Sequence, residues 1–170
     1  MSRFEDCSAR RAILKTGFGL GIQIGLAKAA DNAASMRPKE GDLLVKVDDK
    51  NAVPLTPEDI PLAGEQISVW AMDPADKTVR SGDRLNRILV LRFSSDQLSP
   101  ETKVRSAEGV VAYTAICTHA GCEVTDWIPD KQQVFCPCHD STLDPEDAGK
   151  VVDGPAPRAD ASGSAAQDRG

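Results

Sequence analysis

Short apolar runs, separated by glycine, proline and aspartate, dominate the middle of this 170-residue chain. The runs are Leu43–Val47, Ile67–Met72, Ile88–Phe93, Val110–Ile116, Val134–Phe135 and Val151–Val152. They are rich in β-branched residues, and the long intervals between them lack a 3.6-residue apolar period. The pattern therefore predicts an all-β domain with long loops, in which Asp73–Asp83 is an excursion between two strands. Tyr113 and Trp127 are expected to be packing residues.

The first thirty residues have the pattern of an export signal. Arg10 and Arg11 are followed by an apolar pair and a lysine, as in a twin-arginine signal. The apolar stretch from Thr16 to Ala27 contains glycines at four positions, which disfavour a soluble amphipathic helix because each costs about 1 kcal/mol. The sequence Ala27-Lys28-Ala29 then has the small-x-small form of a cleavage site.

This N-terminal stretch is short for a membrane span. Twelve residues separate Lys15 from Lys28, whereas a helix needs roughly 20 to cross a bilayer. We therefore expect a protein exported to the periplasmic side of a bacterial inner membrane. It would be soluble after cleavage, or held at the membrane if residues 1–30 remain as an N-terminal anchor.

The remainder divides into three predicted parts. Residues 31–41 are polar, contain Pro38 and are expected to be a linker. Residues 42–157 hold the apolar runs and form the domain. Residues 158–170 are small and polar, which is typical of a disordered tail.

Charge and the count of metal-ligating residues exclude several function classes. The formal charge is −6 and the isoelectric point about 4.9, which argues against a nucleic-acid binder and favours a basic partner such as a c-type cytochrome. There are five cysteines and only two histidines, and both histidines and four cysteines lie between Cys117 and His139. A metal site that needs a third histidine is therefore excluded.

Two short boxes carry these residues. They are Cys117-Thr118-His119-Ala120-Gly121-Cys122 and Cys136-Pro137-Cys138-His139-Asp140-Ser141. Each box supplies one histidine and two cysteines at the end of an apolar run. Six candidate ligands are too many for one tetrahedral zinc ion, whereas a site with four ligands plus one disulfide accounts for all six. Exported proteins tolerate disulfides, which agrees with the N-terminal pattern.

The boxes resemble the C-T-H-x-G-C and C-P-C-H-x-S motifs of Rieske [2Fe–2S] proteins. The stretch Gly154-Pro155-Ala156-Pro157 is similar to the proline-rich loop that closes over the cluster in that family. The resemblance implies an antiparallel β-sandwich with a small cluster-binding subdomain of two loops. It further implies iron ligands and a disulfide, in the pairs Cys117 and Cys136 on one iron, His119 and His139 on the outer iron, and Cys122 and Cys138 as the disulfide. Such a disulfide is typical of the cytochrome bc and arsenite oxidase small-subunit types.

Three positions bear on the expected reduction potential and partner. Ser141 matches the serine whose hydroxyl donates to a bridging sulfide in the family, but Leu143 replaces the tyrosine of high-potential members. Histidine ligation alone raises the potential from about −400 mV to a range of roughly −150 to +300 mV. With one donor missing, we expect a value below the top of that range. Ala120 stands where cytochrome bc members carry leucine, which weakens the case for a quinol-facing role.

Three functional hypotheses follow from these features. The first is an electron-transfer subunit that passes single electrons from a quinol or a larger oxidoreductase subunit to a c-type cytochrome. The second is the iron–sulfur subunit of a membrane-anchored quinol–cytochrome c reductase, with a cytochrome b as partner. The third is a redox-inert zinc or disulfide module that mediates interaction. The sequence identifies no substrate pocket, so catalysis by this chain alone is not expected.

Overall fold

The structure is a computed structural model that describes residues 32–157. The predicted signal at residues 1–30 and the predicted polar tail at residues 158–170 lie outside these residues. Within them, no helix is both long enough and apolar enough to cross a membrane.

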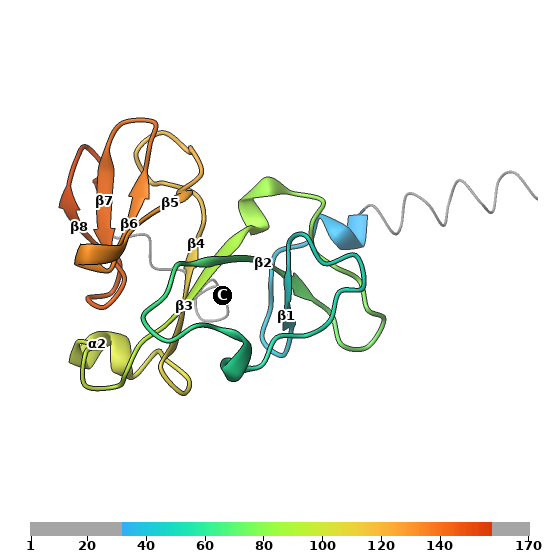
Figure 1. Cartoon of the computed structure of the whole chain (residues 1–170). Helices are drawn as coiled ribbons and strands as arrows, with labels where there is room; N and C mark the ends of the chain where they lie inside the picture. The colour runs from blue at the N-terminus through green and yellow to red at the C-terminus, as the bar shows by residue number, and fades with distance from the viewer. Residues whose placement is uncertain (1–31, 158–170) are drawn as a thin grey trace, which may run out of the picture.

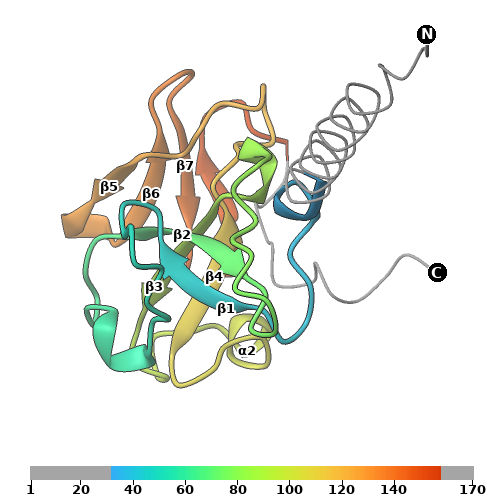
Figure 2. The ribbon, with the colours of Figure 1, turned by 90° about the vertical axis from the view of Figure 1, so that its right-hand side faces the viewer.

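Two antiparallel sheets of four strands each make up the described chain (Figures 1 and 2). The first sheet, in spatial order, contains β1 (Leu43–Lys46), β2 (Ile67–Met72), β3 (Ile88–Arg92) and β4 (Val110–Thr114). The second sheet contains β5 (Asp126–Ile128), β6 (Gln133–Cys136), β7 (Ser141–Asp144) and β8 (Lys150–Asp153). Strands adjacent in sequence are adjacent in space, so both sheets are meanders. The predicted all-β antiparallel fold is confirmed.

Short helical turns lie in the connections between the strands. They are η1 (Pro57–Asp59), η2 (Arg84–Asn86), α2 (Pro100–Lys103) and η3 (Pro129–Lys131). The predicted excursion Asp73–Asp83 does lie between β2 and β3, and the Asp83 carboxylate accepts a 2.9 Å hydrogen bond from the Leu85 amide at the start of η2. Asp83 thus ends the excursion as the N-cap of η2.

The two sheets share one apolar core. In β4 the buried positions alternate, so that Val111 and Tyr113 point inward. From the second sheet Val134 and Leu143 pack against them, and Leu143 is only 1% exposed. Burying a side chain of this size is worth about 1.5–3 kcal/mol, so this interface holds the sheets together.

Residues 32–41, the predicted linker apart from its first residue, lie against the β2–β3 connection. The Asn86 side-chain amide donates a 2.8 Å hydrogen bond to the Met36 carbonyl, and the Gly82 amide donates one of 3.0 Å to Ala34. Just after this segment, Asp42 forms a buried ion pair with Arg80. Burial alone would raise the pKa of Asp42, but the hydrogen bond from Arg80 holds that pKa below its usual value.

Candidate metal centre

The first box forms a closed loop beyond the end of β4. The Cys117 amide donates a 2.7 Å hydrogen bond to the Cys122 carbonyl, and the Gly121 amide donates one of 2.9 Å to the Cys117 carbonyl. Gly121 has a φ of +73°, a left-handed conformation that glycine adopts without a steric penalty. The ends of the box are therefore fixed by backbone contacts, while Thr118, His119 and Ala120 at its tip are exposed.

The second box forms the turn between β6 and β7. Cys136 and Ser141 are paired across the two strands, which places both at the mouth of the turn. Asp140 has a φ of +59° just before β7 begins, and aspartate tolerates this left-handed conformation better than most residues. The strand register thus buries Cys136 and leaves Cys138 and His139 exposed on the turn.

A disulfide between Cys122 and Cys138 links the two boxes, as the family resemblance implies. The two residues are 16 positions apart, and their Cα atoms are 6.5 Å apart. This bond fixes the distance between two loops that belong to different parts of the chain.

The other four predicted ligands form two pairs of different character. Cys117 and Cys136 are free thiols and are 2% and 1% exposed. The imidazole rings of His119 and His139 are exposed, with centroids 4.5 Å apart and planes at 88°. The structure therefore brings the two thiols together in the interior and the two imidazoles together at the surface.

The surroundings of the Cys136 sulfur suit a metal-bound thiolate. Burial raises the pKa of the Cys136 thiol, and the neighbouring Cys117 thiol raises it further. The backbone N–H groups of Cys138 and His139 donate to the same sulfur and act in the opposite direction. Hydrogen bonds of this kind to a cysteine sulfur tune the reduction potential of an iron–sulfur cluster. A bound cation would supply the charge that two buried thiolates need.

Paired donors fit a two-iron cluster. The candidate ligands lie as a pair of thiols and a pair of imidazoles. A [2Fe–2S] cluster takes two protein ligands on each iron, and in the Rieske type two cysteines serve one iron and two histidines the other. The thiol pair and the imidazole pair match this requirement.

The predicted covering loop packs against the second box. The Ala156 amide donates a 3.2 Å hydrogen bond to the Ser141 hydroxyl oxygen, and Ser141 is fully buried. Gly154 has a φ of +90°, and a Cβ there would lie 2.5 Å from the Ser141 Cα. Glycine is therefore required at position 154. The Ser141 oxygen accepts from Ala156, and a hydroxyl that accepts one hydrogen bond can still donate its own proton.

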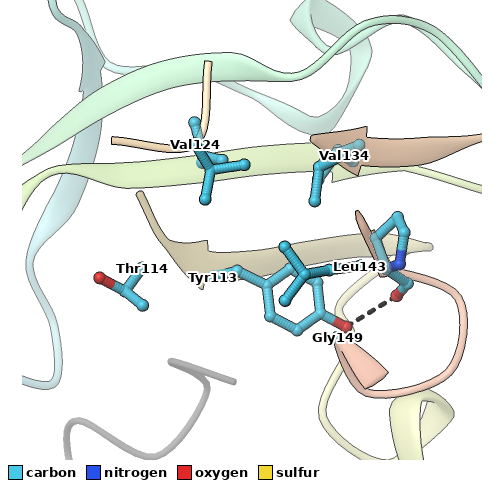
Figure 3. Close-up of a pocket in the computed structure, with 9 residues that line it drawn as sticks. Tyr113, Thr114, Val124, Val134, Leu143 and Gly149 are labelled. Atoms are coloured by element: carbon cyan, nitrogen blue, oxygen red, sulfur yellow. Dashed lines mark hydrogen bonds between the residues drawn. The ribbon is translucent and has the colours of Figure 1, made fainter. Parts of the chain in front are cut away.

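Leu143 occupies the interior between the sheets (Figure 3). Its side chain lies beside Tyr113 and Val134, next to a cavity of about 10 Å³. The tyrosine found at this position in high-potential relatives would have to occupy this packed region. The Tyr113 hydroxyl does not substitute for it, because it donates a 2.7 Å hydrogen bond to the Pro145 carbonyl.

Two arginines beside the first box were missed by the sequence reasoning. The Arg84 guanidinium donates a 2.8 Å hydrogen bond to the Gly121 carbonyl. Arg87 forms a 2.7 Å ion pair with Glu123 and lies 5.2 Å from the centre of the Trp70 ring. Both contacts join segments distant in sequence, so no local pattern marks them.

The domain is an antiparallel β-structure with two disulfide-linked loops. These loops present a pair of thiols and a pair of imidazoles, which is the donor set of a protein that holds a two-iron cluster. Comparison with known proteins identifies the protein family. Residues 45–164 match the Rieske [2Fe-2S] domain family. The chain therefore belongs to this family, its cofactor is a [2Fe–2S] cluster, and its function is electron transfer through that cluster.

Relatives come from respiratory complexes. The cytochrome bc1 complex Rieske iron-sulfur subunit of Streptomyces lividans is 30% identical over 119 residues, which cover 69% of each chain. The subunit of the same name in Streptomyces coelicolor is also 30% identical, but this chain spans only 33% of its length. A protein of Haloferax mediterranei, inferred to be the Rieske subunit of a respiratory nitrate reductase, is 33% identical over 56% of this chain and 46% of its own.

Among solved structures, the soluble domain of Rieske protein II (soxF) from Sulfolobus acidocaldarius aligns with 78% of this chain and 64% of its own. The TM-score is 0.31 and the identity is 16%.

Proposed function

We propose that Cys117 and Cys136 bind one iron of the cluster and that His119 and His139 bind the other. The observation that carries this assignment is the separation of the four side chains into a buried thiol pair and an exposed imidazole pair, with the imidazole centroids 4.5 Å apart. A cluster bound in this way supplies a one-electron acceptor and donor whose potential lies above that of all-cysteine clusters.

The surrounding residues have defined roles in this proposal. The exposed imidazoles place the outer iron at the protein surface, where a redox partner can approach it directly. The buried cysteines and the Gly154–Pro157 loop shield the inner side from water. The N–H groups of Cys138 and His139 stabilise negative charge on the Cys136 sulfur and so favour the reduced state.

For the complex, we favour a subunit that receives single electrons from a quinol or a larger oxidoreductase subunit and passes them to a c-type cytochrome. The name of the Streptomyces lividans relative supports a cytochrome bc1-type complex, and with it a cytochrome b partner. The net charge of −6 supports a basic electron acceptor. Ala120 replaces the leucine typical of bc subunits, which favours a donor other than the usual quinol site.

The ligand assignment is tested by spectroscopy on the full-length protein. The wild type should be reddish brown, contain two irons and two sulfides per chain and give an EPR signal when reduced. His139→Cys should retain iron but show a lower potential, because a thiolate adds negative charge. Zinc in place of iron in the wild type, with no redox activity, would instead support the interaction-module hypothesis.

Subunits that copurify with the native protein decide between the complexes. A cytochrome b in the purified assembly would support a quinol–cytochrome c reductase. A large catalytic subunit without cytochrome b would exclude that complex and support an oxidoreductase such as the nitrate reductase inferred for the Haloferax relative.

Export and domain boundaries belong to the same proposal. Residues 1–30 would act as a twin-arginine signal or anchor, residues 31–41 would lead into the domain at residues 42–157, and residues 158–170 would form a tail. Changing Arg10 and Arg11 to lysine should trap cluster-containing protein in the cytoplasm. Normal export of this variant would exclude the twin-arginine route, and fractionation of the wild type would distinguish a soluble form from an anchored one.

A further inference from the structure

We propose that Arg84 is a positioning residue for the redox centre. It would hold the first box in place through the Gly121 carbonyl and also bring an unpaired positive charge to the edge of the cluster site. The inference rests on the proposed ligand assignment, since it concerns the loop that carries Cys117 and His119.

The contact between Arg84 and the first box is direct. The Arg84 Nη1 atom donates a 2.8 Å hydrogen bond to the Gly121 carbonyl oxygen across 37 positions of sequence. Gly121 lies between His119 and Cys122, and its own amide is bonded to the Cys117 carbonyl. The loop is thus held at Gly121 from both sides, by its own backbone and by the arginine.

The backbone that carries Arg84 is itself fixed. Asp83 caps η2 through the Leu85 amide at 2.9 Å. Asn86, at the end of η2, is 1% exposed and donates hydrogen bonds to the carbonyls of Met36 and Arg80. A guanidinium held by such a frame loses less side-chain entropy when it binds a carbonyl than one on a mobile loop.

The charge of Arg84 is not neutralised within the described chain. Arg87 lies next to the same box, but Glu123 pairs with it at 2.7 Å. No ion pair joins Arg84 to a carboxylate among residues 32–157. Reduction adds one negative charge to the centre, so a nearby unpaired cation favours the reduced state. Arg84 is exposed, and salt should therefore screen its effect.

The test uses the full-length, cluster-loaded protein and three variants. Arg84→Gln removes the charge, Arg84→Lys retains it, and Arg105→Gln is a matched control. Arg105 is an exposed arginine that pairs with Glu101 at 3.3 Å. It follows α2, whose Thr102 hydroxyl accepts a hydrogen bond from the Ala148 amide. Ala148 lies beyond the end of β7 that is remote from the second box. The measurements are the midpoint potential at low and high salt, the EPR line shape, and the rate at which a phosphine reduces the Cys122–Cys138 disulfide.

We expect Arg84→Gln to lower the potential at low salt, with a smaller difference at high salt, and to speed reduction of the disulfide several-fold because the loop loosens. Arg84→Lys should keep the potential near that of the wild type. Arg105→Gln should leave all three measurements unchanged. This pattern separates a charge near the cluster from a general loss of stability.

Either of two results would overturn the inference. One is a wild-type potential in Arg84→Gln at low salt, and the other is an equal fall in Arg84→Gln and Arg84→Lys. A wild-type protein that holds no [2Fe–2S] cluster, by absorbance and EPR, would instead refute the proposed ligand set. The two failures are therefore distinguishable in the same set of samples.

Discussion

The hydroxyl of Tyr113 donates a 2.7 Å hydrogen bond to the carbonyl oxygen of Pro145, and this bond joins the first sheet to the chain just beyond β7 (Figure 3). Tyr113 lies in β4, four positions before Cys117, and Pro145 follows the strand that begins at Ser141. A second contact supports the same turn, since the Ala148 amide donates a 2.8 Å hydrogen bond to the Thr102 hydroxyl. The end of the second sheet remote from the boxes is thus attached to the first sheet by polar contacts.

The first prediction concerns Tyr113 and alkaline pH. Burial raises the pKa of Tyr113 to about 12, whereas an exposed tyrosine titrates near 10. The unfolded chain therefore loses this proton first, and stability falls as the pH rises from about 10 to 12. Below pH 10 the full contribution of Tyr113 to the free energy of unfolding is present. A shift of this size corresponds to roughly 3 kcal/mol, measured as the free energy of unfolding in denaturant.

Tyr113→Phe is the control for this prediction. The variant should lose about 1–3 kcal/mol at neutral pH, because the Pro145 carbonyl is left buried without its donor. The difference between wild type and variant should then shrink across the alkaline window, since only the wild type carries the titrating group. A constant difference from pH 9 to 12 would contradict the assignment.

Replacing Ser141 with alanine is expected to weaken the covering loop and lower the potential. The Ala156 amide would lose its acceptor, at a cost of about 1–3 kcal/mol. Loss of the hydroxyl donor to a sulfide should lower the midpoint potential by roughly 20–65 mV, which is one net hydrogen bond of about 0.5–1.5 kcal/mol in a one-electron couple. Ser95→Ala, at an exposed serine between β3 and α2, should change neither quantity. An unchanged potential in Ser141→Ala would show that this hydroxyl does not reach the cluster.

Substitutions at position 143 distinguish the effect of side-chain volume from the effect of a hydroxyl group. Leu143 is 1% exposed beside a cavity of only about 10 Å³, so both Leu143→Phe and Leu143→Tyr should overpack the interface and lose about 1–3 kcal/mol. Relative to the phenylalanine variant, the tyrosine variant should have a potential higher by roughly 20–65 mV, if its hydroxyl reaches the Cys136 sulfur. Equal potentials by voltammetry would mean that the phenol points elsewhere.

Removal of the disulfide should destabilise the protein without removing the four candidate ligands. For a separation of 16 positions, loop-closure entropy gives about 3 kcal/mol for a double Cys122→Ser, Cys138→Ser variant. Chemical unfolding of the wild type, with the disulfide intact and with the disulfide reduced, measures the same loss of unfolding free energy independently. Reductant should destabilise the wild type and leave the variant unaffected; an equal effect on both would locate the sensitive bond outside this pair.

The sequence predicted those parts of the fold that have a local pattern. The strands of the first sheet are apolar runs, and the paired boxes indicate both the site and, through the family, the disulfide. β5 and β7 were missed. β7 contains Ser141 and Thr142, which resemble a loop in sequence, yet both are buried because β7 lies between β6 and β8. Their burial depends on the neighbouring strands rather than on their own hydrophobicity.

Contacts between distant segments were not predictable for a different reason. The hydrogen bond from Arg84 to Gly121 joins two loops, and neither loop has a periodicity that specifies its partner. The same holds for the contact of Asn86 with Met36, since polar residues near a proline are typical of a linker whether or not they pack on the domain. Such contacts depend on the assembled tertiary structure.

The docking of Ala34 and Met36 on the β2–β3 connection has a mechanical consequence. A force applied at residue 34 would pass through Gly82 and Asn86 into η2, and from Arg84 directly into the first box. That route reaches the redox site without crossing either sheet. Binding of a partner protein at Ala34 and Met36 would therefore bear on the loop that carries His119 before it affected the rest of the domain.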